Sequence, residues 1–481
     1  MRSRTGVSLA CLVLAAVGGC QSYRPAPFDI AAHRGEFEAR AFTVEPVEAF
    51  AARLREAGSE VPDKINFDDG LSAAEAEVVA LFYNPELRLA RMEAGIALAT
   101  FETAGLWEDP AFGFDGADIL SSAAPFEFGF MLSITLPVSG RLAVEKDRAG
   151  AAHTVELRRI EDAEWRTRAT LRRAWIAWVT AKEQAGVHRD VLSQIEQIVS
   201  ITNQLEAAGE LQRIEGRLFR VELAARRAAL INAELAAAEA RRDLLSIIGM
   251  PPDAAITLVP SVPAVKPDLS PDRLARLINS NTQLSIRRAE YQLAEQSLRL
   301  EVRKQYPDIS IGSGYGNEDD DRLMLGVSLP VPLLNANRGG IATAHATRAR
   351  ARTVAETTYE HLARALASAQ AALDAARIQR THYTSEILPL LAQQAAEVQR
   401  VAELGDVDTL LFLDTVTRQF DAKIYLLDLQ FAELEIAITI EQLLGPDWAT
   451  DPTPIPANPD SPESALLHTE STTPIAAGGY Q

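Results

Sequence analysis

Two stretches of alternating residues, nearly two hundred positions apart, constrain this chain more than any other feature. Residues 306–340 and residues 110–141 each read as strand, polar turn, strand, with large apolar side chains alternating with small or polar ones. A period of two places the two sets on opposite faces of a strand. We therefore predict two β-hairpins, each with one apolar face and one small or polar face. The predicted strands span about residues 110–117, 126–137, 307–316 and 322–333.

The two hairpins belong to a longer internal repeat, because other short matches recur at almost the same spacing. Pro110 and Pro307 are 197 residues apart, as are the segments Asn84-Pro-Glu-Leu and Asn281-Thr-Gln-Leu. Two glycine pairs, Gly209 with Gly405 and Gly249 with Gly445, are 196 apart. Ordered matches at one spacing indicate a duplication in which each copy is a structural unit.

Long helices fill the rest of each copy. Residues 142–208 contain no proline, and a helix of that length would be roughly 100 Å long. A second long helix is predicted from about 341 to 404, and one helix is predicted before each hairpin, over about 72–106 and 272–303. The returning helix that follows carries an apolar seam with spacings of three and four residues, which is typical of a coiled coil. The seam residues are Leu413, Val416, Phe420, Ile424, Leu427, Phe431, Leu434 and Ile438.

Composition restricts the class of partner. The chain has 481 residues and a net charge of −19, with no basic block, which argues against binding nucleic acid. No run of eighteen apolar residues occurs in the body of the chain, so no membrane helix is predicted there. Strands of about ten residues are long enough to cross a bilayer when tilted, but four strands cannot close a barrel. Three copies would supply twelve.

The N-terminus reads as a secretory signal, with basic Arg2 and Arg4 before a short apolar segment and small residues just before Cys20. This arrangement resembles a bacterial lipoprotein signal, with residues 1–19 removed and Cys20 acylated by palmitate as the first mature residue. Gln21 and Ser22 follow, without the aspartate of an inner-membrane retention signal, which favours the outer membrane. The alternative is a plain signal peptide with a chance cysteine.

The duplicated plan resembles the TolC-like outer-membrane efflux family over about residues 72–444. The segments AGLWEDPAFGF at 104–114 and LPVPLLNANRGGI at 329–341 are similar to the branch that serves heavy-metal efflux of the resistance-nodulation-division type. The resemblance implies a mainly α fold with a small transmembrane β part: a trimer with a 12-stranded barrel and a 12-helix periplasmic tunnel. The expected parts are a lipid-anchored segment at 20–70, repeat 1 at 71–249, an equatorial connector at 250–271, repeat 2 at 272–445 and a disordered tail at 446–481.

The resemblance also implies a function. The chain would be the exit duct of a tripartite efflux system, working with a periplasmic adaptor and an inner-membrane pump on metal cations or drugs. Glu403, Asp406 and Asp408 would form cation-attracting rings at the periplasmic gate, although Asp408 could instead cap a helix. The adaptor would contact the two tip turns, and small or polar strand residues would face the barrel lumen. The tip residues are Gly209, Glu210, Gly405 and Val407, and the lumen residues are Met131, Ser133, Met324 and Ser328.

No enzyme activity, cofactor or resident metal is expected. The seven histidines show no ligand spacing, and no local motif marks a catalytic triad or carboxylate pair. Met131 and Met324 occupy equivalent positions and could contact soft metals, but plain lining of the strand face is favoured. The alternative from another class is a periplasmic coiled-coil adaptor or scaffold lipoprotein without a barrel.

Overall fold

The structure is a computed structural model that describes residues 23–40, 44–56, 58, 61–118, 126–263, 272–318, 320–403 and 409–446. The chain divides into two units, residues 1–41 and 42–481. In the first unit, helix α2 (Ile30–Glu38) begins after Asp29, whose carboxylate accepts hydrogen bonds from the backbone N–H groups of Ala31 and Ala32. This is an ordinary N-cap, which satisfies donors that the first turn leaves free. All other described elements belong to the second unit.

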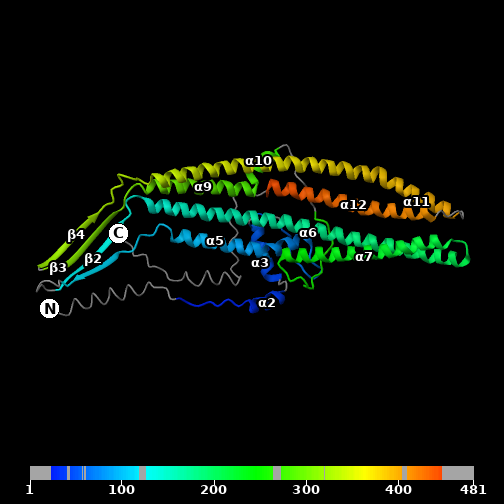
Figure 1. The fold of residues 1–481 in the computed structure, drawn as a ribbon, viewed down its shortest axis with the longest axis horizontal. Coiled ribbons are helices and arrows are strands. Elements are labelled where there is room, and N and C mark those ends of the chain that lie inside the picture. Colours follow the sequence, from blue (N-terminus) through cyan, green and yellow to red (C-terminus); the bar gives the residue numbers. More distant parts are fainter. Residues whose placement is uncertain are drawn as a thin grey trace. The chain divides into compact units, whose positions relative to one another are not determined.

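The second unit confirms the predicted order of elements in both copies (Figure 1). The first copy contains α4 (Ala73–Tyr83), α5 (Pro85–Thr103), β1 (Ala111–Ala117), β2 (Glu127–Leu136), α6 (Arg141–Ala208) and α7 (Arg213–Ile248), preceded by α3 (Val44–Glu56). The second contains α8 (Arg273–Ser280), α9 (Thr282–Arg303), β3 (Ile309–Glu318), β4 (Asp320–Ser328), α10 (Arg338–His382), the π-helical turn η1 (Tyr383–Ile387), α11 (Leu388–Glu403) and α12 (Thr409–Leu444).

The prediction of a single helix before each hairpin is wrong, because an asparagine divides that helix in both copies. Asn84 ends α4 and caps α5 by accepting from the N–H groups of Glu86 and Leu87. Asn281 ends α8 and caps α9 in the same way. The side-chain amide of each asparagine also donates to a carbonyl near the end of the returning helix, Ile247 for Asn84 and Leu443 for Asn281, both at 2.8 Å. The sequence match at these positions therefore marks a shared joint between helices.

The prediction of one continuous second long helix is wrong. The helix contains the π-helical turn η1 between α10 and α11. Pro389 lies just after this turn. A proline in a helix lacks the N–H that would bond four residues back, and its ring clashes with that carbonyl, so a wider turn relieves the conflict.

The π-helical turn also explains a small change in the repeat spacing. Leu171 and Leu366 are 195 residues apart and occupy matching places in the cores of the two copies, and so do Trp178 and Leu373. Beyond the turn, Gly209 and Gly405 are 196 residues apart. One residue has therefore been added in between, which is what a π-helical turn accommodates within an α-helix.

The strands form one antiparallel sheet in the order β1-β2-β3-β4, so the two hairpins pair with each other through β2 and β3. The predicted strand positions are close, except that β4 ends at Ser328 rather than near 333. Pro330 and Pro332 account for this difference, because proline cannot donate to the ladder. β3 and β4 extend further into the acidic segment than predicted, to Glu318 and Asp320.

The helices pack along one another in a way that follows the duplication. α6 packs against α5 and α7 of its own copy and against α9 and α12 of the other, while α9 lies between α6 and α10 (Figure 1). One buried core joins α3 and α4 to α6 and α7, and a smaller one joins α8 and α9 to α10 and α12. Among the described residues, no helix combines the length and apolar character needed to cross a membrane.

Candidate functional site

The sheet brings the four predicted lumen residues to one face. Met131 of β2 and Met324 of β4 both lie opposite Gly314 of β3, so they flank it on the same side. Ser133 lies two residues along β2, opposite Gly312, and Ser328 lies opposite Ser310. Because side chains alternate along each strand, all four share this face. We call it the small face, because glycine is the most frequent residue at its remaining positions.

At some positions of the small face, a residue larger than glycine would collide with a neighbouring group. A side chain at Gly314 would place its Cβ 2.7 Å from the carbonyl oxygen of Phe130, and Cε of Met324 already lies 3.4 Å from the same point. At Gly129 the added Cβ would lie 2.7 Å from a carboxylate oxygen of Asp115. The glycines therefore let Met324 and Asp115 fold back over neighbouring strands.

The opposite face of the sheet is apolar and largely exposed, and we call it the apolar face. Leu325 is 80% exposed, and Leu323 and Val327 are exposed to a similar degree. On β1 and β2, Phe112, Phe114 and Phe128 contact the ring of Phe130 at centroid distances between 5.2 and 6.0 Å. An apolar surface of this extent, unlike single exposed residues, marks contact with lipid or with another protein.

A charged cluster ties the base of the sheet to the start of α6. The carboxylate of Asp308, just before β3, accepts from the backbone N–H of Ser139 at 3.1 Å and lies 3.5 Å from Nε of Arg141. Arg141 also donates to Glu145 and Glu108. Partial burial alone would raise the pKa of Asp308, but the hydrogen bonds from Ser139 and the charge of Arg141 hold that pKa below its usual value.

The first tip turn, between α6 and α7, is well defined. Gly209 has φ +80°, and the N–H groups of Gly209 and Glu210 donate to the carbonyls of Glu206 and Leu205, which closes the end of α6. Gly209 and Glu210, both predicted to contact the adaptor, are exposed. Glu206 forms an ion pair with Arg220 of α7 at 3.2 Å.

The predicted lipidation site and the predicted residues of the second tip turn lie outside the described residues or at their edge. Gly405, Asp406, Val407 and Asp408 lie outside the described residues, as does Cys20. Glu403 is the last residue of α11, and its side chain is not among those described.

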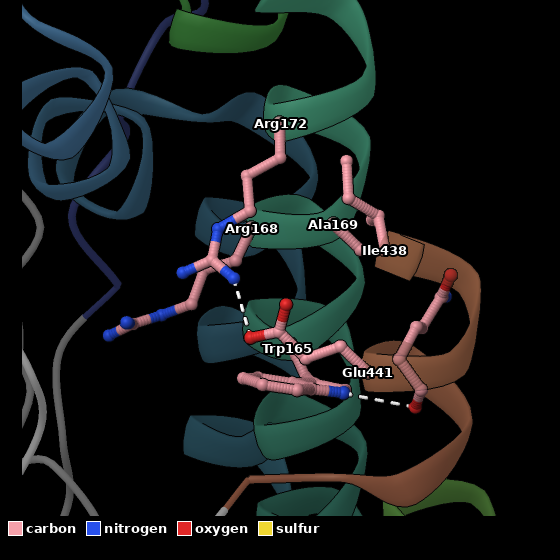
Figure 2. A pocket seen from close by; sticks show the side chains of 7 residues that line it. Trp165, Arg168, Ala169, Arg172, Ile438 and Glu441 are labelled. Carbon is pink, nitrogen blue, oxygen red and sulfur yellow. Dashed lines mark hydrogen bonds and ion pairs between the residues drawn. The ribbon is translucent and has the colours of Figure 1, made fainter. Parts of the chain in front are cut away.

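A partly buried ionic network, which sequence reasoning missed, joins the two copies. Arg172 of α6 donates to Glu77 of α4 at 2.5 Å and to Glu441 of α12 at 2.6 Å. Figure 2 shows the Arg172 guanidinium reaching the Glu441 carboxylate beside a small pocket lined by Arg168, Trp165 and neighbouring residues. Burial alone would lower the pKa of Arg172, but the two carboxylates raise it overall, so this arginine stays charged.

The network fixes how α12 lies against α6. One turn before Arg172, the buried Arg168 has its pKa lowered by burial and lies 3.8 Å from Glu77. Trp165 donates its indole N–H to the Gln442 carbonyl at 3.1 Å, and Arg173 donates to the Gln442 side chain. The one sequence signal was the pair of glutamates, Glu75 and Glu77, within the otherwise apolar helix α4, because buried carboxylates require partners.

No group of three or more histidine, cysteine, aspartate or glutamate side chains in the described part of the chain is placed to hold a metal ion.

Comparison with known proteins gives one curated relative and a set of solved structures. No protein-family profile matches the chain. The cobalt-zinc-cadmium resistance protein CzcC of Cupriavidus metallidurans is 24% identical over 243 residues, which cover 50% of this chain and 58% of CzcC. The chain therefore spans a little over half the length of this curated relative.

The solved structures are membrane proteins at low sequence identity. A membrane protein from Pseudomonas aeruginosa matches with a TM-score of 0.69 and 17% identity, covering 79% of this chain and 91% of that one. CusC matches with a TM-score of 0.66 and 17% identity, covering 78% and 92%. The outer-membrane channel OprN matches with a TM-score of 0.67 and 15% identity, covering 89% and 99%. At these identities the comparison establishes the fold.

Proposed function

We propose that this chain, which has the fold of the TolC-like outer-membrane channels, assembles as three copies into the exit duct of a tripartite efflux system. Each copy would contribute its four strands to a 12-stranded barrel in the outer membrane and its long helices to a 12-helix periplasmic tunnel. An inner-membrane pump and a periplasmic adaptor would deliver the substrate. No chemistry is assigned to the chain, which conducts the substrate.

The observation that carries this proposal is the two-faced sheet. Its apolar face is exposed and suits lipid, whereas its small face of glycine, serine and methionine suits a water-filled interior. In the sheet that the described residues form, β1 and β4 are the edge strands, so each has one side whose backbone groups no neighbouring strand covers. A hydrocarbon environment does not satisfy such groups, so the edges must pair with those of further copies.

The helices support assembly independently, through the internal repeat. In the second copy of the repeat, α9 is covered on one side by α10 and on the other by α6. In the described part of the chain, the matching helix of the first copy, α5, packs extensively against one long helix, α6. Its residues Leu89, Met92 and Ile96 are exposed, although the matching α9 residues are buried or half-buried. Those matching residues are Ile286, Ala289 and Leu293.

The repeat therefore indicates what covers α5. Since α6 covers α9 within one chain, the helix that matches α6, which is α10, would cover α5 from a neighbouring chain. Repeating this contact around a three-fold axis would give a closed ring, as a head-to-tail interface does when its rotation closes.

The ends of the assembly carry the remaining proposed roles. At the periplasmic tip, three copies of Glu403, Asp406 and Asp408 would form rings of like charge that attract cations. Gly209 and Glu210 at the first turn, with Gly405 and Val407 at the second, would meet the adaptor. Cys20 would carry the lipid anchor. Met131, Ser133, Met324 and Ser328 would line the barrel lumen.

We further propose metal cations, rather than drugs, as the first substrates to test. The support is the match to CzcC, whose name specifies cobalt, zinc and cadmium resistance. Deleting the gene should sensitise the cell to one or more of these ions, and the wild-type gene should restore resistance.

Assembly is tested by the mass of the full-length protein extracted from the outer membrane, measured under native conditions. A mass of three copies supports the duct, whereas a monomer that extracts without the outer membrane supports the alternative of a periplasmic adaptor or scaffold. Ile96, which is 69% exposed, provides the matched variants. Ile96→Asp should lower the yield of trimer, and Ile96→Val should leave it unchanged.

A further inference from the structure

One histidine, His188, lies where the helices α6 and α7 contact the returning helix α12. The ring of His188 on α6 packs edge-on against Phe420 of α12, with centroids 4.8 Å apart. Its Nδ1 atom is buried and has no hydrogen-bond partner among the described residues. A neutral imidazole tolerates this position, because its proton can reside on Nε2.

The apolar cluster around this contact joins α6 and α7 to α12. Its buried members are Val191, Ile195, Val199, Phe219 and Phe420. It lies on the part of α12 that leads towards Thr409, where α12 begins after the second tip turn. The cluster therefore determines how firmly the tip-proximal part of α12 is held to the first copy of the repeat.

The cationic side chain of Arg226 lies close to the histidine. The Arg226 guanidinium of α7 lies over the Phe420 ring, 4.6 Å from its centroid, and is paired with Glu222. Burial and then the charge of Arg226 lower the pKa of His188 below its usual value. Other charged groups on the three helices are paired or exposed. They include Asp428, bonded to Gln184; Arg189, paired with Glu234; Arg227, paired with Glu196; and the exposed Asp190, Asp421 and Lys423.

We propose that protonation of His188 loosens the packing of α12 against α6 and α7, so that acidification releases the tip-proximal part of α12. The added proton would place a charged N–H where no acceptor is available and beside the Arg226 cation. Both effects disfavour the packed state, because an unpaired buried donor and a like charge each carry a cost. When α12 moves away, water can solvate the imidazolium.

The difference in His188 pKa between the packed and released states determines how the stability of the contact changes with pH. The packed state has the lower His188 pKa, so its stability is full above the ordinary pKa of about 6.5 and declines as pH falls towards the lowered value. Each unit of difference between the two pKa values can change the packed-to-released ratio by up to about tenfold.

The test is hydrogen exchange of the full-length protein, followed by mass spectrometry at about pH 7.5 and about pH 5.5, on either side of the histidine pKa. The ratio of protection in a peptide spanning Phe420 to protection in a peptide from α9 corrects for the intrinsic pH dependence of exchange. In the wild type this ratio should fall at the lower pH, by up to about tenfold. The measurement does not require that the protein form a duct. The result can therefore contradict the proposal about His188 without bearing on the proposed function, and the reverse also holds.

Matched variants separate the histidine from other acid effects. His188→Gln keeps a polar side chain of similar size that does not titrate, so the fall in ratio should disappear. His188→Phe provides a second non-titrating variant if the glutamine weakens the fold. His188→Lys should show low protection at both pH values. An equal fall in His188→Gln and in the wild type would overturn the proposal.

Discussion

Gly445 lies against the carbonyl of Ser280 so closely that no side chain fits between them. Its φ is +80°, and an added Cβ would lie well inside contact distance of the Ser280 carbonyl group. Gly249 has the same relationship with the Tyr83 carbonyl in the first copy of the repeat. Each glycine thus ends a returning helix where it meets the joint between two helices, beside the asparagine that caps the next one.

Replacing Gly445 by alanine should therefore destabilise the helical unit. The left-handed backbone alone costs about 1–2 kcal/mol for a residue with a side chain, and the clash adds to it. Thermal denaturation in detergent, followed by far-ultraviolet circular dichroism, measures the loss. Gly186→Ala is the control, because Gly186 lies within α6 with open space around it, and alanine there should be neutral or stabilising by up to about 1 kcal/mol.

Glu77→Gln should weaken the attachment of α4 and α12 to α6. It removes the charge that faces Arg172 and the buried Arg168, and breaking a buried ion pair from one side costs about 3–5 kcal/mol. The same thermal measurement detects it. Glu234→Gln removes one side of the exposed pair with Arg189, so its effect should stay below about 1 kcal/mol. Equal losses in both variants would contradict the assigned role of the network.

The cluster at the base of the sheet should make stability depend on acid. Because the folded pKa of Asp308 is lowered, its contribution is present above the ordinary value of about 3.9 and is lost as pH falls through the lowered one. Asp308→Asn should therefore lower the melting temperature near neutral pH and flatten its fall in acid. Asp109→Asn, at an exposed position, should follow the wild type.

The proposed gate gives a prediction about ion selectivity. Asp406→Ala should reduce cation selectivity and weaken block by multivalent cations in planar-bilayer recordings, and adding Glu403→Ala should deepen the effect without changing trimer assembly. Asp408→Ala should cost about 1 kcal/mol of local helix stability with little change in selectivity. A selectivity change in Asp408→Ala alone would reverse the two assignments.

Much of the fold could be predicted because the sequence contains an internal repeat, so each element is indicated twice. Period-two alternation fixed which residues share a face of the sheet, and the register of Met131, Gly314 and Met324 confirms it. The match between Gly249 and Gly445 in the repeat corresponds to two equivalent helix ends, each with the positive φ that favours glycine. The divided helices at Asn84 and Asn281 and the π-helical turn before Pro389 were missed, although asparagine and proline both mark such places.

The site was less predictable than the fold. Glu77, Arg172 and Glu441 come together from three helices, with 95 residues between the first two and 269 between the last two. No local pattern links residues at such distances, since their contact depends on how the two copies of the repeat pack. The contact of His188 with Phe420, which joins α6 to α12, could not be predicted either, because these two residues are also far apart in the sequence.

The central claim is that the apolar face of the sheet meets lipid and the small face meets water. Leu325 and Met324 are adjacent on β4, are both exposed, and point to opposite faces, so the same change to arginine made at each position in turn tests both environments. The measurement is the yield of heat-modifiable trimer in the outer membrane. Leu325→Arg should sharply reduce it, because arginine at the middle of a bilayer costs about 2–4 kcal/mol, whereas Met324→Arg should assemble. Normal assembly of Leu325→Arg together with loss of Met324→Arg would contradict the account.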